Sequence, residues 1–134
     1  MIPTAIYAVP TAKGTDEALA AVEAALKERG FSVLWHLDMR ETLRQKGQPF
    51  EPEFHVLEVC SAPRAKQALE TNIEVGFLLP CTLTVYSDPG DGDRIKIGLL
   101  RPESALALLG DPRLNVLAAE VERQLREAVA AAAG

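Results

Sequence analysis

A turn signal, Asp88-Pro89-Gly90-Asp91-Gly92, lies between two runs of alternating apolar residues. The run before it covers residues 77–86 and the run after it covers residues 94–100, each with an apolar side chain at every second position. A period of two is that of a strand with one buried face, and proline and glycine between two such runs indicate a tight turn. The chain must therefore contain a β-hairpin, so part of its sheet is antiparallel.

Three further strands and five helices follow from similar patterns. We expect strands over residues 2–9, 31–37 and 54–60, and helices over 15–29, 38–46, 61–72, from Pro102, and over 113–130. Thr15 and Ser61 are the expected helix caps. The alanine-rich tail, residues 128–133, is expected to fray because an alanine helix without a partner is marginal.

The order of these elements is β-α-β-(α)-β-α-β-β-α-α. It predicts one α+β domain over residues 1–134, with a mainly antiparallel five-stranded sheet and helices covering one face. A chain of this length buries enough apolar surface to hold one core without a disulfide or a metal.

Composition excludes several classes of partner. The net charge is −5, from 14 basic and 19 acidic side chains, and no basic cluster suited to phosphate is present. We therefore expect neither a nucleic acid nor a membrane as partner. The N-terminal residues show no secretion signal, so we expect a cytoplasmic protein with reduced cysteines.

One set of segments resembles a known family. Cys60-Ser61-Ala62-Pro63, the block Gly76-Phe77-Leu78-Leu79-Pro80-Cys81, and Val85-Tyr86 are similar to the signature of the domain of unknown function 302 family, and residues 31–38 with Leu43 resemble its second strand. The resemblance covers nearly the whole chain. It implies the fold, and it implies no established activity, cofactor or catalytic residue.

The two cysteines are the first candidates for chemistry. Cys60 directly precedes a predicted helix N-terminus, where the helix dipole favours a thiolate slightly. Cys81 lies on the apolar side of its strand, where burial should raise its pKa. One hypothesis is that both are small core residues, and the other is that they form a redox or nucleophilic pair.

His36 and His55 lie on neighbouring predicted strands and could meet across the sheet. With Asp38 and Cys60 they are the available metal ligands, but their spacing matches no zinc motif, so no metal or other cofactor is predicted. Pro80 cannot donate to a strand ladder and marks an edge or a bulge. We expect any ligand pocket to lie beside it.

These observations leave two hypotheses about function. The first is a small ligand-binding or sensor module without a catalytic motif, acting as a homodimer through surplus leucines of the C-terminal third (Leu99, Leu100, Leu106, Leu108, Leu109 and Leu114). The second is a thiol-dependent redox protein or small enzyme that uses Cys60 and Cys81. The first is preferred because no catalytic pattern accompanies the thiols.

Overall fold

The computed structural model describes residues 4–134. Five strands alternate with helices along the chain, as the hydrophobic patterns predict. The strands are β1 (Ile6–Pro10), β2 (Ser32–Asp38), β3 (Phe54–Cys60), β4 (Cys81–Asp88) and β5 (Arg94–Leu100). The α-helices are α1 (Thr15–Glu28), α2 (Met39–Gln45), α3 (Ala62–Thr71), α4 (Pro102–Ala107) and α5 (Asn115–Ala133). Short 3₁₀ helices are η1 (Ile73–Leu78), η2 (Pro89–Asp91) and η3 (Pro112–Leu114).

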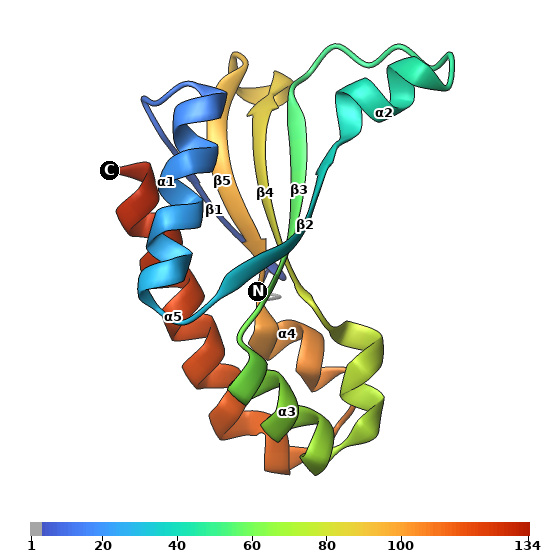
Figure 1. Cartoon of the computed structure of the whole chain (residues 1–134), viewed down its shortest axis with the longest axis vertical. Coiled ribbons are helices and arrows are strands. Elements are labelled where there is room, and N and C mark those ends of the chain that lie inside the picture. The colour runs from blue at the N-terminus through green and yellow to red at the C-terminus, as the bar shows by residue number, and fades with distance from the viewer. Residues whose placement is uncertain (1–3) are drawn as a thin grey trace.

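The strands form one sheet in the order β1-β5-β4-β3-β2, with every neighbouring pair antiparallel. The expected α+β fold is confirmed. The hairpin at residues 88–93 joins β4 to β5, and Gly92 takes the left-handed conformation (φ 61°) that such a turn needs. Figure 1 shows α1 and α5 lying side by side against one face of the sheet, while α3, η1 and α4 gather beyond one end of it.

The main core lies between the sheet and the helix pair. Leu57, Val59, Leu83, Val85, Ile97 and Leu99 of the sheet pack against Ala18, Val22, Leu26, Leu125 and Val129 of the two helices. Each large side chain removed from water here contributes about 1.5–3 kcal/mol to folding. We call this the covered face of the sheet, and its opposite the open face.

The N-terminal part differs from expectation in two details. The first strand was expected from Ile2, which lies outside the described residues, and β1 begins at Ile6. Gly14, and not Thr15, occupies the N-cap position of α1. The hydroxyl of Thr15 donates instead to Glu53 Oε2 at 2.5 Å, which joins α1 to the segment before β3.

The fourth strand is shorter than predicted. It begins at Cys81, and the preceding apolar residues form the 3₁₀ helix η1. Asn72 starts that helix by accepting a hydrogen bond from the amide of Glu74 at 2.9 Å. The alternation of apolar residues at positions 77–80 therefore does not indicate a strand here. Val75 of η1 is buried in a second, smaller core with Ala68 and Leu114, whereas Phe77 is 88% exposed.

The expectation that the alanine tail frays is wrong. Ala128, Val129 and Ala132 are buried in the main core. Lys13 Nζ donates to the carbonyl of Ala132 at 2.7 Å and satisfies one of the free carbonyls at the helix end. Among residues 4–134, no helix has the length and apolar character of a membrane span.

Candidate functional site

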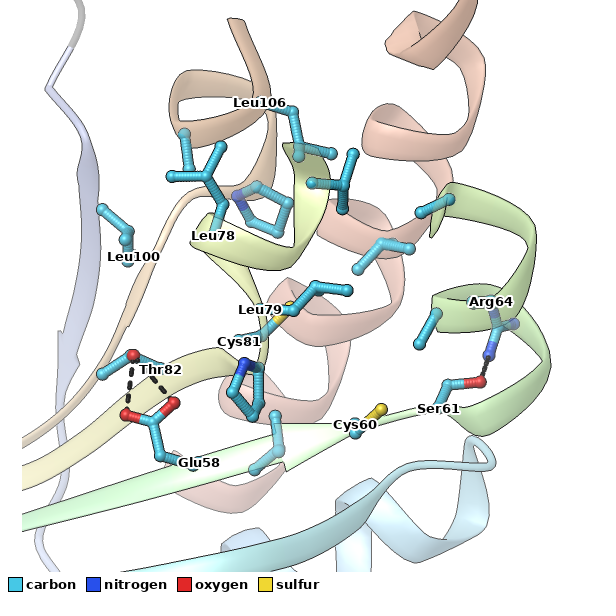
Figure 2. Close-up of a pocket in the computed structure, with 18 of the residues that line it drawn as sticks. Glu58, Cys60, Ser61, Arg64, Leu78, Leu79, Cys81, Thr82, Leu100 and Leu106 are labelled. Carbon is cyan, nitrogen blue, oxygen red and sulfur yellow. Dashed lines mark hydrogen bonds between the residues drawn. The ribbon is translucent and has the colours of Figure 1, made fainter. Parts of the chain in front are cut away.

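A cavity of about 290 Å³ lies where the sheet ends and the smaller helices begin. Its walls come from the ends of β3, β4 and β5, from α3, η1 and α4, and from one side of α5. Figure 2 shows the labelled side chains of these elements converging on this space. The volume is at the lower end of the range, about 300–1,000 Å³, that small-molecule sites occupy.

Most of the lining is apolar. Leu78 and Leu79 enter from the end of η1, Leu106 from α4, and Leu100 from the end of β5. Small side chains on the facing helices, Ala65, Ala68 and Ala105 among them, leave the space open. The cavity lies beside the apolar segment before Cys81, most of which forms the 3₁₀ helix η1 and contacts α4 instead of extending the strand.

Glu58 and Thr82 form a polar pair at one side of the cavity. They are directly opposite in the β3–β4 register and both face away from the covered face. Thr82 Oγ1 is 3.0 Å from Glu58 Oε1 and 3.2 Å from Oε2, so its single proton is shared between the two carboxylate oxygens. Both side chains are partly buried.

Arg64 lies at the other side of the cavity, on the first turn of α3 (Figure 2). Ser61 holds the N-cap position of this helix, but its hydroxyl makes no capping bond, contrary to expectation. It lies 3.3 Å from Arg64 Nη1 instead. The guanidinium also stacks over the ring of Phe31 at 5.2 Å and lies 3.5 Å from Glu120 Oε1.

Both candidate cysteines line this cavity, and both are free thiols. Burial raises the pKa of Cys60, so the slight effect of the helix N-terminus does not produce a thiolate there. Burial, with the nearby Cys60 and Glu58, raises the pKa of Cys81 to about 11. Both sulfurs are therefore protonated at neutral pH, which is unfavourable for nucleophilic or redox chemistry.

Pro80 also lines the cavity, next to Cys81, where the sequence predicted a pocket. It sits just before β4, joined to Leu79 by a cis peptide bond, and is not part of a bulged strand. The cavity thus brings together Cys60, Pro80 and Cys81 of the candidate residues.

His36 and His55 lie apart from this cavity but touch each other. His36 Nε2 is 2.8 Å from His55 Nδ1, and the ring centroids are 5.0 Å apart. These two distances require both nitrogens to lie close to the line that joins the ring centroids, so each nitrogen points at the other ring, as in a hydrogen bond. The lone pairs then do not converge on a third point, and within residues 4–134 no three potential ligands are arranged to hold a metal.

Glu58 was not singled out by the sequence. The signal available was its position as the single charged residue in the strand Phe-His-Val-Leu-Glu-Val-Cys. The strand period places it on the face opposite Leu57 and Val59. Its hydroxyl partner, however, comes from a strand 24 residues further along the chain, and only the folded sheet reveals it.

Comparisons with known proteins agree with this architecture. The model of the family described as "Domain of unknown function DUF302" matches residues 7–132. A crystal structure of an uncharacterized conserved DUF302 protein from Bacillus stearothermophilus superposes with a TM-score of 0.92 at 34% sequence identity, covering 97% of this chain and 99% of that one. No curated protein matches the chain.

Proposed function

The chain belongs to the DUF302 family, for which no activity is established, and from its cavity we propose that it is a small-molecule binding or sensor protein. The observation that carries this proposal is a concave, mostly apolar lining with a few polar groups at its margin, the composition typical of ligand sites. Thr82 holds the carboxylate of Glu58 in place. Ser61 and the ring of Phe31 hold the guanidinium of Arg64.

A thiol-dependent activity is less well supported. An activated cysteine needs a depressed pKa, and burial raises the pKa of both thiols. In the binding hypothesis Cys60 and Cys81 act as small apolar wall residues. Two free thiols suit a reducing compartment, and we propose that the protein works in the cytoplasm.

The proposal includes a homodimer, which uses Leu100 of the expected leucines together with a residue of β1 that was not expected. Leu99 and Leu114 are buried, so they are core residues and cannot bind a second copy. Ile6 and Leu100 lie on the open face with large exposed fractions, and they pair directly in the β1–β5 register. Apolar side chains on an uncovered sheet face favour association, and a closed two-fold dimer is the commonest assembly. Light scattering at micromolar concentration tests it, and a monomer would contradict it.

Binding is tested with a neutral apolar probe, 1-octanol, followed by chemical shifts of the Leu79 and Leu106 methyl groups. We expect saturable changes at these methyls. The variant Ala105→Trp fills the cavity from α4 and should abolish them, whereas Ala107→Trp places the same ring on an exposed position of the same helix and should not. Unchanged binding in the Ala105 variant would contradict the proposal.

A further inference from the structure

The charges around the cavity are not balanced within the protein. Glu58 accepts hydrogen bonds from the neutral hydroxyl of Thr82, and within residues 4–134 no lysine, arginine or histidine lies within ion-pair distance of it. A carboxylate has about four lone-pair sites, and one hydroxyl proton leaves most of them free. Glu58 therefore presents an uncompensated negative charge at the edge of an apolar space.

Arg64, the one cationic residue of the lining, already contacts other groups of the protein, although its anionic partner Glu120 also pairs with Arg123 at 2.7 Å. The guanidinium of Arg64 contacts Glu120 at 3.5 Å, the carbonyl of Arg29 at 3.4 Å and the ring of Phe31. Figure 2 shows it on the far side of the cavity from Glu58, with Leu79 and Cys81 between them. The cavity thus offers a ligand one free charge, and that charge is negative.

An aromatic side chain stands beside that charge. Trp35 is opposite Glu58 in the β2–β3 register, on the same open face, and is 50% exposed. A carboxylate with an indole nearby is a combination that suits an ammonium group, through an ion pair and a cation–π contact. The apolar lining then accommodates an aliphatic chain attached to that ammonium.

We propose that the cavity selects an amphiphilic amine, with its ammonium group on Glu58 and its aliphatic chain among Leu78, Leu79 and Leu106. This inference rests on the proposed binding function and adds the charge of the ligand to it. A carboxylate ligand of the same length is disfavoured, because it would place a second negative charge beside Glu58 without a free cation to meet it.

The test compares three probes of equal chain length: octylammonium chloride, 1-octanol and sodium octanoate. Trp35 is the single tryptophan of the chain, so its fluorescence reports binding next to Glu58, and calorimetry gives the affinities. We expect octylammonium to bind at least about tenfold more tightly than octanol, as one charge-assisted hydrogen bond allows, and octanoate to bind most weakly.

Two variants distinguish a contact between the ammonium group and Glu58 from an effect of the net charge of the protein. Glu58→Gln should reduce octylammonium affinity to that of octanol, with octanol affinity unchanged. Glu23→Gln removes the same charge from an exposed position of α1 outside the cavity and should leave all three affinities unchanged. The melting temperature of each variant verifies that it is folded.

The outcomes distinguish the two proposals. If octanol and octanoate bind as tightly as octylammonium, or if the preference for octylammonium survives Glu58→Gln, the amine inference is wrong and the binding function stands. If none of the three probes binds, both are wrong.

Discussion

Glu122 of α5 lies 2.9 Å from Arg101 Nε, although the Glu122 side chain is only 4% exposed. Its second oxygen accepts a hydrogen bond from the backbone amide of Glu103, at the start of α4, at 3.1 Å. One carboxylate therefore joins the end of β5, α4 and α5, the three elements that form one side of the cavity. Without Glu122, the largely buried guanidinium of Arg101 would keep only the longer ion pair with Glu103, at 3.4 Å, and the amide of Glu103 would lose its acceptor.

We expect Glu122→Ala to lower the free energy of unfolding by about 3 kcal/mol, as measured by urea denaturation. The matched control on the same helix is Glu127→Ala, which removes the ion pairs of an exposed carboxylate with Arg29 and Arg123 and should cost far less. Equal losses in the two variants would show that the burial of Glu122 has no energetic consequence.

The thiols provide a second prediction. Cys81, with its pKa near 11 against 9.0 for an ordinary thiol, carries about a hundredfold less thiolate at neutral pH. Iodoacetamide should therefore label Cys81 at least about a hundredfold more slowly in the native protein than in urea. Cys60, which is less buried, should react faster than Cys81 but more slowly than a free thiol.

The same state of the thiols predicts that reductants have no effect on stability. Both cysteines are free, so dithiothreitol should leave the melting temperature unchanged. A fall in melting temperature on reduction would show that a bridge contributes to the fold.

Local patterns were sufficient to predict several elements. The strand at residues 54–60 and the strand at 94–100 have their predicted bounds, and α3 follows Ser61 as expected. In the two strands, the alternation of apolar residues favours the same structure as the tertiary contacts do, and so does the N-cap position of Ser61 in the helix. The positions of His36 and His55 as diagonal neighbours on one face also follow from the strand period, once their strands are paired.

Elsewhere tertiary contacts outweighed the local pattern. The apolar alternation before Cys81 is typical of a strand, yet burial of Val75 against Leu114, some 39 residues away, favours a 3₁₀ helix there. The walls of the cavity could not be predicted for the same reason, because they come from elements distant in the sequence. Pro80 indicated the place, and nothing local indicated Glu58 or its pairing with Thr82.

The burial of the alanine-rich end of α5 predicts that its two faces respond differently to substitution. Ala128 is 1% exposed and faces the core, whereas Ala130 is exposed on the same turn. Ala128→Glu should destabilise the protein by about 2–4 kcal/mol, through crowding and a buried charge, while Ala130→Glu should change stability by less than about 0.5 kcal/mol. A tail that frays would tolerate both substitutions equally.

The histidine pair predicts how stability depends on pH. Burial, the largest influence, lowers the pKa of His55, and the proton on nearby His36 lowers it further. The carboxylates of Asp38, Glu53 and Asp16 act in the opposite direction but do not reverse the shift. Two protonated rings whose nitrogens are 2.8 Å apart would repel each other, so protonation of both rings is unfavourable in the native state.

The unfolded chain takes up this proton near pH 6.5, above the pKa of His55 in the native state. Its contribution to stability is therefore complete above about pH 6.5 and is lost as the pH falls toward the native pKa. Urea midpoints measured between pH 7.5 and pH 5.5 should fall for the wild type and fall less for His55→Gln. His36→Gln should retain much of the dependence, because burial of His55 is the larger cause. Parallel profiles for the wild type and His55→Gln would contradict this account, since the remaining lowered pKa values belong to carboxyl groups that titrate below this range.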